Sequence, residues 1–73
     1  MKDEKYLIEL GEKIAELRKK KDWTQLELAE KLKIQRTALT RIELGKVNST
    51  INMLRKIAKT LDIKVIELLD IKE

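Results

Sequence analysis

Residues 24–46, TQLELAEKLKIQRTALTRIELGK, predict two short amphipathic helices separated by a very short break. Apolar residues recur at helical spacing on both sides of the break, namely Leu28, Ala29, Leu32, Leu39 and Ile42. Only residues 33–35 separate Leu32 from Arg36, near the start of the second of these helices. Because a connection this short does not let the helices run antiparallel, they must cross steeply, with Ile34 as the apolar side chain that fixes the crossing. The stretch therefore predicts a helix-turn-helix.

Capping signals mark the ends of several helices. Thr24 and Glu27 form the S/T-x-x-E capping box, in which each side chain pairs with a backbone N–H group that the first turn leaves free. Gly45 stands where the helix-turn-helix ends and a left-handed residue is needed, and Thr50 is placed to cap the next helix. Lys64 is a poor start for the last helix, because a short polar acceptor would serve better there.

The same periodicity extends over the rest of the chain. It marks a first helix at Leu7, Leu10, Ile14 and Leu17, a fourth at Ile51, Leu54, Ile57, Ala58 and Leu61, and a short fifth at Val65, Ile66, Leu68 and Leu69. With no Pro, two Gly and few aromatic residues, the sequence favours helices over sheet. We expect an all-α bundle of five helices that forms one domain over residues 1–73.

Composition narrows the classes of function. The chain has no Cys and no His, which removes the thiolate nucleophile, the commonest general base and the commonest metal ligands. We therefore expect no enzyme, no metal and no cofactor. The first ten residues, MKDEKYLIEL, lack the apolar run of a secretory signal, and no long apolar segment exists, so a cytoplasmic location with no membrane contact is expected. The net charge of +4 suits an anionic partner.

Three motifs together resemble one family. T-Q-x-E-L-A at 24–29, I-E-x-G at 42–45 and L-x-K-I-A-x-x-L at 54–61 are similar, at these separations, to the Cro/repressor (Xre-type) helix-turn-helix family. The resemblance implies a lambda-repressor-like DNA-binding domain, in which the third helix enters the major groove and the second lies across the backbone. It implies a sequence-specific transcriptional regulator, and we expect a repressor that acts by occupying a promoter.

The resemblance also implies roles for individual residues. It assigns contacts with DNA bases to Gln35, Arg36, Thr37 and Thr40. It assigns contacts with DNA phosphates to Thr24, Gln25, Arg41, Lys46 and Asn48. A partly buried ion pair between the first and third helices is implied for Arg18 and Glu43. For Thr37 and Thr40 taken singly, simple exposure to solvent is the alternative. Lys19, Lys20 and Lys21 form either an anion-binding patch or a complement to the helix dipole.

Lys33, Gln35 and Ser49 depart from the family pattern, Ser49 because Pro is frequent at its position. Lys33 stands where Gly usually ends the second helix, so either Lys33 adopts a strained left-handed conformation or the turn is remodelled. Gln35 replaces the usual Ser or Thr cap of the third helix, which weakens capping and offers a longer polar side chain to DNA.

The C-terminal stretch predicts self-association. Its apolar residues are too many for one face of a short helix, which assigns a homodimer interface to Val65, Ile66, Leu68, Leu69 and Ile71. A dimer would bind a near-palindromic operator with its recognition helices about 34 Å apart. The alternative is that these residues only close the bundle. A second class of function is a protein-interaction module, such as an antitoxin that binds a toxin through the C-terminal helix.

Overall fold

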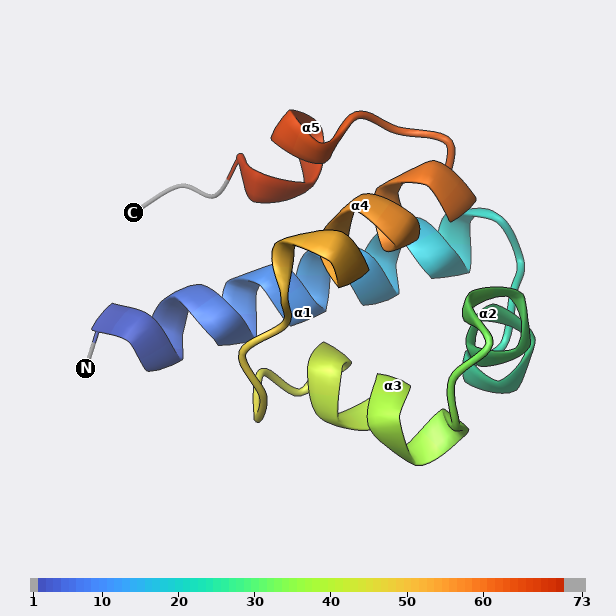
Figure 1. The fold of residues 1–73 in the computed structure, drawn as a ribbon, viewed down its shortest axis with the longest axis horizontal. Coiled ribbons are helices and arrows are strands. Elements are labelled where there is room, and N and C mark those ends of the chain that lie inside the picture. The colour runs from blue at the N-terminus through green and yellow to red at the C-terminus, as the bar shows by residue number, and fades with distance from the viewer. Residues whose placement is uncertain (1, 71–73) are drawn as a thin grey trace.

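The protein forms an all-α structure, as the periodicity predicts. A computed structural model describes residues 2–70 and contains, in that range, only helices and their connections. The helices are α1 (Lys2–Lys20), α2 (Gln25–Leu32), α3 (Arg36–Glu43), α4 (Ile51–Thr60) and α5 (Val65–Leu69). Helix α1 contacts both α3 and α5, which lie on opposite sides of it in Figure 1. None of the helices in residues 2–70 is long and apolar enough to cross a lipid bilayer.

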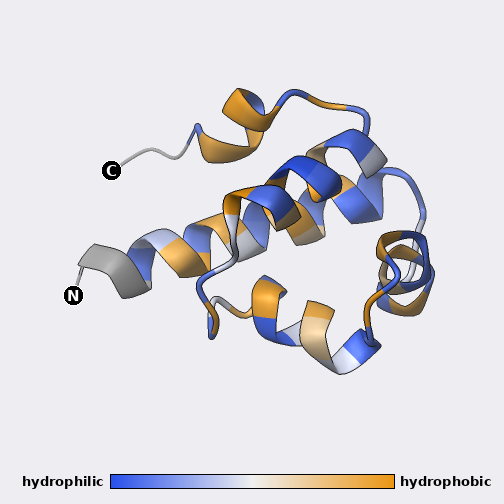
Figure 2. Cartoon of the chain, in the orientation of Figure 1, coloured by the Kyte–Doolittle hydropathy of each residue, from blue (hydrophilic) through white to orange (hydrophobic). Residues whose placement is uncertain are grey.

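The core joins one face of every helix, so apolar and polar faces alternate along the ribbons in Figure 2. Its buried side chains are Leu10, Ile14, Leu28, Ala29, Leu32, Leu39, Ile42, Leu54, Ile57, Ala58, Leu61 and Leu68. Ile34, the predicted apolar plug of the turn, packs against them. Ile51 was predicted on the apolar face of α4 but is 57% exposed, because it is the first helical residue after the cap and lies at the edge of the bundle.

The predicted helix caps are present. Glu27 accepts a hydrogen bond from the Thr24 backbone N–H at 2.8 Å, and the Thr24 hydroxyl accepts from the Glu27 N–H at 3.1 Å. The Thr50 hydroxyl caps α4 by accepting from the Met53 N–H at 3.1 Å. At α5 only half of this arrangement exists, because Glu67 accepts from the Lys64 N–H at 3.2 Å while the Lys64 side chain carries no acceptor.

The turn between α2 and α3 has a left-handed residue that is not glycine. Lys33 has φ 59° and ψ 41°, so it takes the left-handed conformation, at a cost of about 1 kcal/mol relative to Gly. Its N–H donates to the Glu30 carbonyl at 3.1 Å, and the Ile34 N–H donates to the Ala29 carbonyl at 3.0 Å. Of the two alternatives that the sequence left open, the strained turn is the one adopted.

Two glycines lie where backbones meet. A Cβ atom at Gly11 would come within 2.4 Å of the carbonyl oxygens of both Ile42 and Glu43, so α1 touches the last turn of α3 directly. Gly45 has φ 73°, and a Cβ there would come within 2.6 Å of the Ile8 backbone. Gly45 is the left-handed residue that the sequence predicts, whereas the close approach at Gly11 has no such signal in the sequence. Together these contacts fix the end of α3 against α1.

Candidate nucleic-acid interface

The first turn of α3 presents side chains to solvent. Gln35 precedes the helix with φ −75° and ψ 149°, and its side chain makes no capping hydrogen bond. Gln35, Arg36 and Thr37 are all exposed. Within residues 2–70 their side chains have no ion pair or hydrogen-bond partner in the protein. Three consecutive polar side chains, one of them a guanidinium, are therefore available to a ligand.

The last turn of α3 ends in a buried ion pair. Arg18 on α1 donates from Nε to Glu43 Oε2 at 2.8 Å and from Nη2 to Glu43 Oε1 at 3.2 Å, which is the paired geometry of a guanidinium and a carboxylate. The two side chains are only 9% and 4% exposed. Arg18 Nη1 also donates to the Trp23 carbonyl at 2.7 Å, so the guanidinium joins α1, the start of α2 and α3.

Gln25 and Thr40 extend this network to the surface. Gln25 Nε2 donates to Glu43 Oε1 at 2.9 Å, and the Thr40 hydroxyl donates to Gln25 Oε1 at 3.1 Å. The same hydroxyl lies 3.0 Å from the Arg36 carbonyl oxygen, one turn earlier in α3. Both residues were assigned DNA contacts by resemblance, and both are half-buried with protein partners. Their surroundings differ from those of Arg36 and Thr37.

The other residues assigned to phosphate contacts are exposed. Thr24, Arg41, Lys46 and Asn48 all lie on the surface. The Thr24 hydroxyl accepts a hydrogen bond in the capping box. The Lys46 N–H donates to the Arg41 carbonyl at 2.9 Å, so the loop that carries Lys46 closes back onto the end of α3.

The capping box also perturbs a carboxyl group beside this surface. The backbone N–H of Thr24, and after it the Thr24 hydroxyl, hold the pKa of Glu27 below its ordinary value of 4.5. Glu27 therefore stays ionised at neutral pH, and its charge lies in the first turn of α2, where the helix dipole favours an anion.

Trp23 precedes α2 and is flanked by two ammonium groups. Lys21 Nζ lies 5.5 Å and Lys31 Nζ 4.6 Å from the centre of the indole ring, within cation–π range. Trp23 itself packs against the core. At least Lys21 of the basic run at residues 19–21 thus has a contact within the protein.

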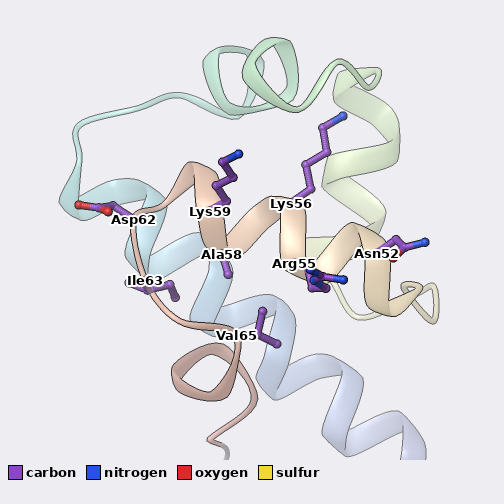
Figure 3. Close-up of a pocket in the computed structure, with 8 residues that line it drawn as sticks. All are labelled: Asn52, Arg55, Lys56, Ala58, Lys59, Asp62, Ile63 and Val65. Atoms are coloured by element: carbon purple, nitrogen blue, oxygen red, sulfur yellow. The ribbon is translucent and has the colours of Figure 1, made fainter.

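A shallow groove lies along α4 and the connection to α5 (Figure 3). Its lining combines polar and basic residues with an apolar floor, namely Asn52, Arg55, Lys56, Ala58, Lys59, Asp62, Ile63 and Val65. Lys56 and Lys59 extend on one side of α4, whereas Ile63 and Val65 lie on the other. The groove contains a single carboxylate, and no cluster of three or more His, Cys, Asp or Glu residues in the described part of the chain is placed to hold a metal ion.

The residues assigned to a dimer interface on α5 differ in their exposure to solvent. Ile66 is 73% exposed, and Val65 and Leu69 are half-buried. Leu68 is fully buried in the core of its own chain, so its assignment to an interface is wrong: it points inward and has no surface to offer a partner. Ile71 lies outside the described residues.

Comparison with known proteins identifies regulators of the same fold. Residues 14–68 match the helix-turn-helix family HTH_3. The clp gene regulator ClgR from Corynebacterium glutamicum is 25% identical with a TM-score of 0.83, and the match covers 88% of this chain and 68% of that chain. The restriction-modification controller C.AhdI from Aeromonas hydrophila is 32% identical with a TM-score of 0.81, over 85% of this chain and 94% of that chain.

SinR is similar in two structures. In the complex of SinR, a master regulator for biofilm formation, with DNA, the identity is 37% and the TM-score 0.77, over 84% of this chain and 98% of that chain. In the complex of SinR with SinI, the identity is 37% and the TM-score 0.79, over 84% of this chain and 60% of that chain. No curated protein matches the sequence significantly. These findings confirm the resemblance and the fold, and they group the chain with regulators and not with enzymes.

Proposed function

This chain belongs to the Xre/Cro-type helix-turn-helix family, and from that membership we propose that it is a sequence-specific DNA-binding transcriptional regulator. SinR, a similar protein, has been seen in complex with DNA. The proposed mechanism is occupation of an operator by α3 in the major groove, with repression as the outcome. Such a regulator acts where the genome is, and we place it in the cytoplasm.

The observation that carries this proposal is the exposed first turn of α3. The side chains of Gln35, Arg36 and Thr37 have no protein partners within residues 2–70, whereas Ile42 and Glu43 in the last turn of the same helix are buried. Arg36 can donate two parallel hydrogen bonds to guanine O6 and N7, a contact worth about 1–3 kcal/mol of discrimination. Thr37 can bond to a base edge or touch a thymine methyl group.

Phosphate contacts would fix the register of α3. Arg41 and Lys46 are exposed cations at the end of α3 and in the following loop, and Thr24, Gln25 and Asn48 add polar donors. Gln25 is also the first residue of α2, where free backbone N–H groups and the helix dipole favour an anion. Each phosphate neutralised by a cation steepens the salt dependence of binding by about 0.9 in the log–log slope.

Specific binding would require two copies, because one recognition helix reads only a few base pairs. We propose a homodimer through the exposed part of α5, formed by Val65, Ile66 and Leu69, on a near-palindromic operator. Ile66→Lys should give a monomer in analytical ultracentrifugation and lose affinity for the full site, while the helical content stays unchanged. If the variant remains dimeric, the dimer interface does not lie on α5.

The test of sequence-specific binding is a selection of bound duplexes from randomised DNA. Wild type should recover a near-palindrome, and Arg36→Ala should relax the preference at one symmetric position. Arg55→Ala is the matched control, because Arg55 is an exposed arginine on α4, in the groove of Figure 3. It should recover the wild-type sequence. If the folded wild-type protein enriches no sequence, α3 does not read bases.

A second candidate is a protein-interaction module, such as an antitoxin, that binds a partner through α5. The 73% exposure of Ile66 favours it, and SinR has been seen in complex with the protein SinI. Salt separates the two functions. DNA binding should weaken steeply between about 50 and 200 mM salt, whereas an apolar interface on α5 should change little.

A further inference from the structure

We propose that Thr40 is a positioning residue, which orients the Gln25 amide toward a DNA phosphate and does not read a base. This inference rests on the proposed DNA-binding function and changes the role that the resemblance gives to Thr40. It follows from the donors and acceptors of three side chains at the junction of α2 and α3, those of Thr40, Gln25 and Glu43.

The proton of the Thr40 hydroxyl is already committed. A hydroxyl has one proton, and two acceptors lie near it, Gln25 Oε1 at 3.1 Å and the Arg36 carbonyl oxygen at 3.0 Å. The second contact is the usual bond of a helical Thr to the carbonyl four residues earlier. Because Thr40 is also half-buried, donating to a base edge would require it to give up both contacts.

The orientation of the Gln25 amide is set by chemistry. The Glu43 carboxylate, which is paired with the Arg18 guanidinium, accepts hydrogen bonds, so the amide nitrogen faces it, at 2.9 Å. The amide oxygen then faces the Thr40 hydroxyl, which is a donor. One acceptor, the Glu43 carboxylate, and one donor, the Thr40 hydroxyl, therefore hold the Gln25 amide in a single orientation.

This pose leaves one donor for a ligand. The amide group has two N–H bonds, of which Glu43 takes one, and the other has no partner in residues 2–70. Gln25 is half-buried and lies at the N-terminus of α2, where the backbone favours an anion. Thr40 thus links the helix that reads bases to the residue that contacts a phosphate, and Glu43 and Arg18 support the link from the core.

The variants Thr40→Val and Thr40→Ser separate the two roles. Valine keeps the shape and the methyl group but removes the hydroxyl, while serine keeps the hydroxyl and removes the methyl group. Thr40→Val should lower affinity by roughly 2- to 12-fold, the range of one hydrogen bond, equally on preferred and non-preferred DNA. Thr40→Ser should bind as wild type does, and both variants should recover the same sequence from randomised DNA.

A double-mutant cycle with Gln25→Ala tests the coupling. In the Gln25→Ala background, Thr40→Val should cause no further loss of affinity, because the group that Thr40 orients is gone. The same cycle on urea unfolding controls for stability. If Thr40→Val weakens binding as much without Gln25 as with it, or if either Thr40 variant shifts the base preference at one position, Thr40 acts on DNA directly and the proposal is overturned.

NMR of the DNA-free protein makes the hydrogen bond testable without a ligand. The side-chain ¹H–¹⁵N signals of Gln25 should move in Thr40→Val and stay in place in Thr40→Ser. Unchanged signals in Thr40→Val would overturn the proposal even if DNA binding is established. If the signals shift but the wild-type protein binds no DNA duplex, the hydrogen bond is confirmed and the proposed DNA-binding function is wrong. The proposed role of Gln25 at a phosphate is then wrong as well.

Discussion

The two ends of α3 differ in what they contact. The first three residues, Arg36, Thr37 and Ala38, are exposed, whereas Leu39, Ile42 and Glu43 further along the helix are buried. The helix starts without a side-chain cap and ends in a two-point ion pair with α1. A helix fixed at its last turn can vary its first turn without disturbing the core. Substitutions should therefore change stability at one end of α3 and binding at the other.

The largest expected effect tests the buried end. Glu43→Ala leaves the Arg18 guanidinium buried without its carboxylate and should lower the free energy of unfolding by about 3–5 kcal/mol. Urea unfolding followed by circular dichroism measures it. Glu30→Ala, at an exposed position on α2, is the control and should stay within about 0.5 kcal/mol of wild type. A loss below about 1 kcal/mol for Glu43→Ala would mean that the ion pair does not anchor α3.

The next effect tests the backbone contact between α1 and the same end of α3. Alanine is normally favoured over glycine within a helix by about 1 kcal/mol. At Gly11, however, the new methyl group meets the Ile42 and Glu43 carbonyls at 2.4 Å, so we expect a net loss of about 1–3 kcal/mol. Thermal unfolding gives the sign directly. Stabilisation by Gly11→Ala would show that the helices separate easily.

A smaller effect of opposite sign tests the exposed end. Gln35→Ser supplies the hydroxyl that α3 lacks at its N-cap and should raise the free energy of unfolding by up to about 1 kcal/mol. It also shortens a side chain offered to DNA, so the selected sequence should change near that contact. Urea unfolding and selection from randomised DNA measure the two results on the same variant. A variant with unchanged stability and unchanged preference would contradict both roles of Gln35.

The smallest effect concerns α2, against which α3 packs. Because the pKa of Glu27 is lower in the folded protein than its ordinary value of 4.5, its charge stabilises the fold above that value, and this stabilisation is lost as pH falls through the folded pKa. Glu27→Gln retains a capping acceptor without the charge. The variant should be less stable than wild type at pH 7 and closer to it at pH 3, in matched urea titrations. A difference that does not depend on pH would exclude the charge as its cause.

Local rules predicted most of the fold. The capping box at Thr24, the cap at Thr50 and the left-handed Gly45 each depend on residues within a few positions, and each appears in the structure. Spacing also predicts the five helices and most of the core. At Lys33 the sequence left two alternatives, because a strain of about 1 kcal/mol is small beside the packing on either side of the turn.

Contacts between distant residues were harder to predict. Helical spacing places Thr40 on an exposed face of α3, but it does not show that Gln25, from another helix, supplies an acceptor 3.1 Å away. A usable signal is the spacing of Thr40 and Glu43, one turn apart, opposite a glutamine at the start of α2. The roles of Gly11 and Leu68 also depend on contacts between helices. Gly11 lies where α1 meets α3, and Leu68 lies where α5 packs on the core. The spacing of residues within one helix does not show such contacts.

The position of Trp23 makes the protein its own optical probe. It is the only tryptophan in the chain, its carbonyl is held by Arg18, and its ring lies near the ammonium groups of Lys21 and Lys31. The emission wavelength and the intensity of indole fluorescence respond to nearby charge. Emission should therefore change when a substitution breaks the hydrogen bonds of Arg18. It should also change when a bound polyanion attracts Lys21 and Lys31 away from the ring. Unlabelled protein is enough to follow both events in a cuvette.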